Sequence, residues 1–217
     1  MSTALIDAIK AKDAVKAREV LAGDPAAARG ASPDGTSLVC LSVYYGQPDI
    51  AEMVAAAKGD LDVFEAAALG RTVRLRELIE DDRSQLRAVA PDGFFPLGLA
   101  AYFRQQEAVR LLLDMGADVH QTASNPTKVT ALHAAVAADH PQIAQWLVEA
   151  GADVNARQQI DYTPLMGAAA NARLEILDLL LAHGANPSMK TTEGKTAADL
   201  ARDHGHGDLA DRLDALG

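Results

Sequence analysis

The amino-acid sequence predicts an all-α solenoid of about seven stacked helical hairpins, joined by short β-hairpin-like fingers. The first observation is a pattern that returns about every 33 residues: Thr-x-Leu, an amphipathic run and a Gly-Ala pair. It is clearest at 130–155 and recurs at 163–186 and, with Phe in place of Thr, at 95–120. A repeat array of this kind grows by adding units rather than by enlarging one core.

Composition is the second observation. Aromatic residues make up only 4% of the chain, whereas Ala and Leu are abundant. Small and linear side chains suit short helices that approach closely, and this composition disfavours a β-sandwich or barrel. The chain is therefore expected to be helical throughout.

The first hairpin is expected at 4–22, where two short apolar runs are separated at 10–13. Gly23, Asp24 and Pro25 end its second helix, because Gly suits a helix cap and Pro cannot continue the helix. The turn Pro33-Asp34-Gly35 follows, and helices are expected again at about 37–45 and 49–57.

A second periodicity links the two parts of the N-terminal half, and it is the third observation. Residues 5–62 align with 63–120 at a constant offset of 58 without a gap, so that Tyr44 meets Tyr102. Two hairpin pairs of any origin resemble each other somewhat, but the unbroken register favours a tandem duplication. The whole of 1–217 is interpreted as one repeat domain, with units at about 4–32, 33–61, 62–90, 91–124, 125–158, 159–191 and 192–217. The polar end of the last unit suits a terminal cap.

Local signals explain each complete unit. Thr130 and Thr163 stand where a hydroxyl can cap the first turn of a helix. Pro96 and Pro164 follow at the first helical position, where a missing amide hydrogen costs nothing. Glycine is expected to end the outer helices in a left-handed conformation, at Gly116, Gly151 and Gly184.

These residues resemble the ankyrin repeat family over nearly the whole chain. The resemblance is strong for 91–217, through Thr-Ala-Leu-His at 130–133, Thr-Pro-Leu-Met at 163–166 and the Gly-Ala-Asp/Asn triplets. It is weaker for 1–90, where the motif reads Ser-Leu-Val-Cys at 37–40. It implies an ankyrin-repeat solenoid that binds partners through its finger tips and concave face. In the family a His at this motif helps to tie neighbouring fingers together; here only His133 keeps it, and Gly98, Met166 and Asp199 stand in its place, so the other fingers lack that tie.

Charge and targeting signals limit the classes of partner and the cellular locations that are expected. The formal net charge is −10, so the chain as a whole repels phosphate backbones, and no nucleic-acid partner is expected. The N-terminus lacks the basic and apolar regions of a signal peptide, and no apolar run is long enough to span a membrane. With a single cysteine, Cys40, no intrachain disulfide is possible, and a cytoplasmic location is expected.

The reactive residues are better explained by structure than by catalysis. His204 and His206 resemble the run between the two helices of a terminal ankyrin unit rather than a metal site. Cys40 fits a buried position without a basic neighbour, where a thiol is inert. Acidic pairs such as Asp81 and Asp82 fall at helix ends. No nucleotide-binding or metalloprotease motif is present, so the protein is expected to be no enzyme and to hold no metal or cofactor.

Aromatic residues instead gather at the positions that ankyrin proteins use for recognition. By register these positions are the finger tips and the concave ends of the inner helices, and six of the nine aromatic residues fall there: Tyr44, Tyr45, Phe94, Tyr102, Phe103 and Tyr162. Large rigid side chains are typical anchors of an interface. For Tyr45 and Phe103, filling a gap between units explains the position as well as recognition of a partner does. Polar contacts are expected from Arg104, Gln105 and Gln47.

The resulting hypothesis is a monomeric, non-catalytic module that binds a protein partner, such as a scaffold, inhibitor or immunity-type protein. The acidic balance favours a basic surface on that partner. The alternative is a small-molecule or enzymatic site in the concave groove, which a closed pocket lined with polar groups would support. An artificial consensus array is disfavoured, because such arrays repeat cleanly and the N-terminal half here is irregular. The regular unit at 125–158 offers only Val129, Ala137 and Ala138 at its recognition positions, so function is expected in 5–120.

Overall fold

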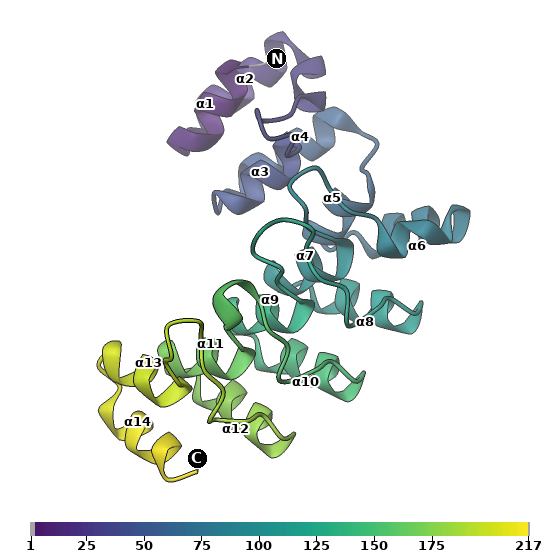
Figure 1. Ribbon diagram of the computed structural model, residues 1–217. Coiled ribbons are helices and arrows are strands. Elements are labelled where there is room, and N and C mark those ends of the chain that lie inside the picture. Colours follow the sequence, from purple (N-terminus) through teal and green to yellow (C-terminus); the bar gives the residue numbers. More distant parts are fainter. Residues whose placement is uncertain (1–2, 217) are drawn as a thin grey trace.

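The computed structural model describes residues 3–216, and its helical hairpins stack one after another along the chain (Figure 1). The prediction of an all-α solenoid is confirmed, since the described residues form fourteen α-helices and no sheet. Strand pairing between them is limited to two isolated bridges, Ala31 with Ser37 and Thr122 with Thr130. The fingers are therefore tight turns rather than true β-hairpins.

Each unit contributes one inner and one outer helix. The inner helices are α1 (Thr3–Ala11), α3 (Leu38–Tyr44), α5 (Val63–Ala68), α7 (Pro96–Tyr102), α9 (Ala131–Ala137), α11 (Pro164–Ala170) and α13 (Ala197–Asp203). The outer helices are α2 (Ala14–Gly23), α4 (Pro48–Lys58), α6 (Thr72–Asp81), α8 (Gln106–Asp114), α10 (Pro141–Glu149), α12 (Leu174–Ala182) and α14 (Gly207–Asp214). Short 3₁₀ turns follow as η1 (Pro25–Arg29), η2 (Arg83–Arg87) and η3 (Gln159–Asp161).

The elements of the N-terminal half recur 58 residues apart. Helices α2 and α6 begin at Ala14 and Thr72, and α3 and α7 begin at Leu38 and Pro96. The turns η1 and η2 keep the same spacing. The equal spacing agrees with the sequence alignment, and a duplication remains the prediction that explains both.

The helix ends follow the local signals. The Thr130 hydroxyl accepts a hydrogen bond from the His133 amide, and Thr163 caps α11 in the same way. The unit that lacks this threonine uses a different cap: Asp62 accepts from the backbone of α5, and Glu65 accepts from the Asp62 amide. The glycines after α8, α10 and α12 have φ between 86° and 93°, as their left-handed role requires.

Neighbouring fingers are joined by backbone hydrogen bonds. Ser124 N donates to Gly93 O at 2.9 Å, Gln159 N to Thr127 O at 2.8 Å and Thr192 N to Ile160 O at 3.0 Å. The last of these lies beside the unit in which Met166 replaces the family's His. The fingers are joined there without the family's His, because the amide-to-carbonyl bonds do not depend on that side chain.

One finger is missing at the junction of α4 and α5. Residues 59–62 connect these helices directly, and the fingers at 33–36 and 91–94 meet across the gap. A Cβ atom on Gly35 would lie only 2.7 Å from Pro91 Cβ, so the two turns are in close contact. Glycine is required at this position both for that approach and for its φ of 87°.

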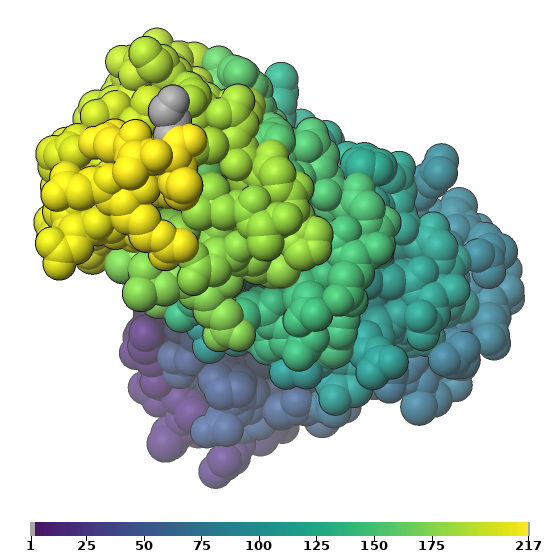
Figure 2. Space-filling model, turned by 90° about the horizontal axis from the view of Figure 1, so that it is seen from below, coloured from purple at the N-terminus to yellow at the C-terminus, as the bar shows by residue number. Residues whose placement is uncertain are grey.

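The apolar core is divided at the same junction. One buried cluster runs from Leu5 to Ala55 and the other from Val63 to Leu213. Between them lies an ion pair in which Lys58 Nζ is 2.7 Å from both carboxylate oxygens of the fully buried Glu65. In the view of Figure 2 the units sweep from yellow through green to blue and back to purple, so the array curves.

Candidate functional site: an apolar groove on the concave face

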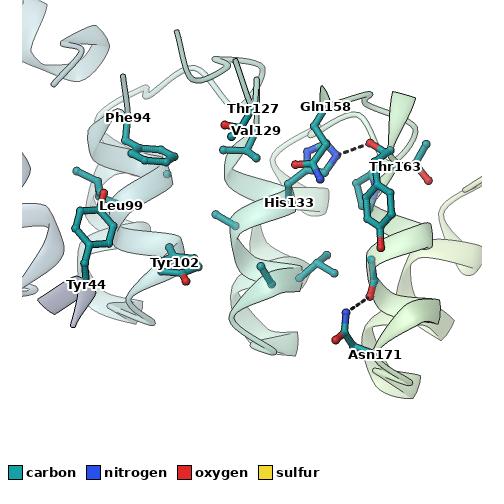
Figure 3. A pocket seen from close by; sticks show the side chains of 17 residues that line it. Tyr44, Phe94, Leu99, Tyr102, Thr127, Val129, His133, Gln158, Thr163 and Asn171 are labelled. Atoms are coloured by element: carbon teal, nitrogen blue, oxygen red, sulfur yellow. Dashed lines mark hydrogen bonds between the residues drawn. The ribbon is translucent and has the colours of Figure 1, made fainter. Parts of the chain in front are cut away.

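The inner helices α7, α9 and α11 enclose a groove of about 340 Å³ with the fingers above them (Figure 3). Its lining comes from Tyr44 at the end of α3, from residues within 96–102, 131–137 and 164–171, and from the fingers that precede these three segments. The residues with side chains at the groove include Tyr44, Phe94, Leu99, Tyr102, Thr127, Val129, His133, Val136, Gln158, Tyr162 and Asn171. Most of these present carbon to the groove, and no charged side chain is among the lining residues.

One wall of the groove is a packed aromatic cluster. The Tyr44 ring lies 5.1 Å from that of Phe103 and 6.2 Å from that of Phe94, and Tyr102 meets Phe103 edge-on at 5.2 Å. Such tilted and edge-on pairs are favourable arrangements of aromatic rings. Tyr102 remains 47% exposed, so the outermost ring of a rigid cluster faces solvent at the groove.

Tyr44 is held in place by a contact between distant units. Its hydroxyl donates a hydrogen bond of 3.2 Å to Asp92 Oδ2 in the finger before α7. Burial, together with the Asp92 charge, raises the pKa of Tyr44 far above its usual range, so the phenol stays neutral. The side chain therefore fixes the wall and offers no acid or base chemistry at neutral pH.

The hollow itself results from small residues. Ala134 and Ala137 on α9 and Gly167 on α11 line the groove where larger side chains would fill it. A Cβ atom at Gly167 would already lie 3.3 Å from Val136 Cγ1. The groove therefore depends on these small residues as much as on the aromatic wall.

His133 lies in the groove wall but is not available as a base. Its Nδ1 accepts from the Thr130 amide, and its Nε2 is 3.2 Å from the Tyr162 carbonyl oxygen. Burial lowers its pKa from 6.5 to about 4, so the ring is neutral at pH 7. With both nitrogens engaged, it joins two units rather than facing a substrate.

Two polar side chains of the far wall, Tyr162 and Asn171, are paired within the protein. Tyr162 OH donates to Met166 O at 3.3 Å, and Asn171 Nδ2 donates to Gly167 O at 3.0 Å. Apart from the side-chain amide of Gln158, few polar atoms of this wall remain to be paired by an occupant, so the arrangement suits an apolar group.

The structure brings four of the eight sequence-predicted site residues to the groove: Tyr44, Phe94, Tyr102 and Tyr162. Phe103 lies behind them and supports two of their rings. The other three, Tyr45, Arg104 and Gln105, are not among the lining residues.

The amides proposed as polar contacts for a partner bond backbone carbonyls of the protein itself. Gln105 Nε2 donates to Ala68 O at 3.0 Å and so links two units, and Gln47 Nε2 donates to the Gly46 carbonyl at 2.9 Å. Tyr45 is 37% exposed, and its ring is not part of the pairs that form the aromatic cluster.

Sequence reasoning missed the contribution of the regular unit at 125–158. Val129, His133, Ala134 and Ala137 of this unit form the middle of the groove. From the sequence, the recognition positions of this unit, Val129, Ala137 and Ala138, are predicted to offer little to a partner. The signal was present as two alanines at the recognition positions between two aromatic-bearing units, but depth is a property of the stacked units and not of one repeat.

The remaining reactive residues do not assemble into a site. Cys40 is buried, and desolvation raises the pKa of its thiol to about 12. Within residues 3–216 no three His, Cys, Asp or Glu side chains come close enough together to bind a metal ion. None of the helices in the same part of the chain has the length and apolar character needed to cross a membrane.

Comparison with known proteins agrees with the fold. Profiles described as "Ankyrin repeats (3 copies)" and "Ankyrin repeats (many copies)" match residues 53–158 and 151–201. Among curated proteins, "Ankyrin repeat and SOCS box protein 16" of Mus musculus is 39% identical over 114 residues, covering 49% of this chain and 25% of that protein.

A "Transient receptor potential cation channel subfamily A member 1 homolog" of Caenorhabditis elegans is 33% identical over 145 residues, covering 67% of this chain and 12% of that protein. The "Glycerophosphocholine phosphodiesterase gde1" of Schizosaccharomyces pombe is 38% identical over 95 residues, covering 41% of this chain and 8% of that protein. The chain spans a quarter or less of the length of these relatives. What they share with it is the repeat array, and on the repeat motifs, the stacked hairpins and both profile matches the chain belongs to the ankyrin repeat family.

Proposed function

We propose that this protein is a non-catalytic interaction module that holds an apolar segment of a partner protein in the concave groove. Ankyrin repeats are generally protein-interaction modules, which makes protein binding the expected use of this surface. The observation that carries the specific proposal is the half-exposed Tyr102 ring at the mouth of an apolar hollow. An aromatic anchor beside a preformed hollow is the usual composition of an interface hot spot.

The absence of a placed nucleophile or base supports a binding role over a catalytic one. Among the lining residues, His133 has both nitrogens engaged and Tyr44 is kept neutral by its surroundings. Neither side chain is arranged to exchange protons with a bound molecule at neutral pH.

Tyr102→Ala and Tyr45→Ala form a matched pair for testing the proposal. Both tyrosines are partly exposed at the ends of inner helices of the duplicated half, Tyr45 after α3 and Tyr102 in α7, but only Tyr102 lines the groove. Affinity purification from the source cells, quantified by mass spectrometry, should recover a partner with the wild type and with Tyr45→Ala. Because hot-spot residues contribute about 2 kcal/mol or more, Tyr102→Ala should weaken capture by about tenfold or more.

Circular dichroism melts of both variants establish that they are folded. Equal recovery of every specific partner by folded Tyr102→Ala and by the wild type would show that the groove is not the binding surface.

A further inference from the structure

The surroundings of the groove differ in charge from the rest of the protein. The whole chain carries a formal charge of −10. We define the frame of the groove as the finger tips 91–95, 124–130 and 157–163 and the inner-helix ends 102–105, 137–140 and 170–173. It contains the acids Asp92, Asp139 and Asp161, and the bases Arg104, Lys128, Arg157 and Arg173. This frame therefore has one more base than acid.

The three acids of the frame already have partners. Asp92 accepts from the Tyr44 hydroxyl, as described above. Asp139 lies 2.8 Å from Arg173, and Asp161 lies 3.4 Å from Arg157. These pairs neutralise two of the four bases.

The other two bases, Arg104 and Lys128, are exposed, and within residues 3–216 neither side chain makes an ion pair or a side-chain hydrogen bond. Lys128 sits on a finger between the lining residues Thr127 and Val129. Arg104 follows the end of α7, two residues beyond Tyr102. The two cations thus flank the groove on its finger side and on its helix-end side.

Both cations are also held in an unusual backbone conformation. Lys128 has a φ of 52° and Arg104 a φ of 61°, a left-handed region that is strained for any residue other than glycine. In the two preceding units, the position equivalent to Arg104 is occupied by Gly46 and Gly70. The chain therefore carries a base where a glycine would fit with less strain.

From this arrangement we infer that the segment bound in the groove is an extended peptide with an apolar residue flanked by carboxylates. This inference rests on the proposed function and specifies the partner's chemistry. The net charge of the chain alone suggests a basic surface on the partner, whereas the charges at the groove suggest an acidic segment. We give the charges at the groove more weight, because salt screens the charges that lie more than about 10 Å away. The seven residues of α7 span about 10 Å, a distance that about three to four extended residues cover. The acids of the bound segment should therefore lie within about four positions of the apolar anchor.

A random twelve-residue peptide library displayed on phage and selected on the intact protein tests the inference directly. Enriched peptides should share an apolar residue with Asp or Glu within about four positions, and they should lose binding to Tyr102→Ala. Synthetic copies of the enriched peptides then give dissociation constants by fluorescence anisotropy. Replacing their acids by the corresponding amides should weaken binding, and so should a rise in salt concentration.

Charge reversals complete the test. Arg104→Glu and Lys128→Glu should each weaken binding of the selected peptides by about threefold to tenfold, as expected for exposed charge pairs turned into repulsions. Arg18→Glu is the matched control. Arg18 is an exposed base on α2, far from the groove, and its replacement by Glu changes the net charge by the same amount. It should have little effect.

The outcomes separate the two proposals. Selected peptides that need Tyr102 but are rich in Lys and Arg, or that bind equally to both reversed variants, would overturn the inference and leave the groove as the binding surface. Peptides that do not need Tyr102, or a library from which nothing is enriched, would count against both.

Discussion

At the scale of single residues, His133 connects the fold to pH. The ring is buried between two units, and its pKa in the folded protein is about 4, against 6.5 when exposed. The unfolded chain therefore binds a proton below about pH 6.5, whereas the folded protein does not until about pH 4. The contribution of the neutral ring to stability is complete above pH 6.5 and is lost as the pH falls through this window.

We expect the free energy of unfolding to fall by about 2 kcal/mol between pH 7.5 and pH 5 because of this one group. Urea denaturation at the two pH values measures the change. His133→Met is the suitable comparison, because Met166 occupies the equivalent position in the next unit and its sulfur accepts from the Thr163 amide. The variant should lose most of this pH dependence, and an equal slope in both proteins would show that His133 is not responsible.

At the scale of the element, the turn between the inner and outer helix of each unit requires a left-handed residue. Gly46 and Gly70 have φ of 66° and 67°, while Arg104, Asp139 and Ala172 adopt φ of 51–61° in the equivalent turns. The same backbone shape is thus made with and without glycine. The units that use other residues keep the turn because the helices on both sides are fixed by core packing.

Gly46→Ala isolates the cost of this conformation. No atom lies within 4 Å of the position that the new Cβ would take, so only the backbone is strained. We expect a loss of about 1 kcal/mol in the free energy of unfolding, measured by urea denaturation. Gly23→Ala is the control, since Gly23 has equally open surroundings without a positive φ. A loss no larger than that of the control would contradict this account.

The same elements show what the sequence can and cannot predict. Helix caps at Thr130 and Thr163 and helix ends at Gly151 and Gly184 depend on neighbours within a few residues, so they could be located from sequence alone. The groove could be predicted only in part. Its aromatic wall follows from register, but its hollow depends on how adjacent units bring small residues such as Ala137 and Gly167 into the same lining.

Gln105 illustrates the same limit. Its register position suggested a partner contact, whereas its amide bonds a carbonyl of the preceding unit. A long side chain such as Gln105 can reach the backbone of its own unit or of a neighbouring one. Which of the two it bonds depends on the distance between the units, and a local sequence pattern does not contain that distance.

At the scale of the whole molecule, the array consists of two apolar cores separated by the ion pair of Lys58 and Glu65. Removing one partner of a buried pair leaves the other charge without compensation. Lys58→Ala is expected to lower the free energy of unfolding by about 3 kcal/mol. The exposed pair of Lys16 and Glu19 provides the control, and Lys16→Ala should change stability little.

Hydrogen exchange followed by mass spectrometry locates the effect. In Lys58→Ala, amides in 3–57 should lose protection together, while those in 96–213 should keep most of it, because repeat arrays are held together mainly by nearest-neighbour contacts. Uniform loss of protection along the whole chain would show that the two cores unfold as one unit.

The divided core also has a mechanical consequence. When a stretched solenoid is loaded at its two ends, every interface between units carries the same tension, and the interface with the least apolar contact parts first. Here that place is the connection at 59–62, where a finger is missing and one charged pair occupies the space between the cores. We expect the first extension step in single-molecule pulling to release the two N-terminal hairpins, and with them Tyr44 of the aromatic wall, while helices α7 to α11 stay stacked under load.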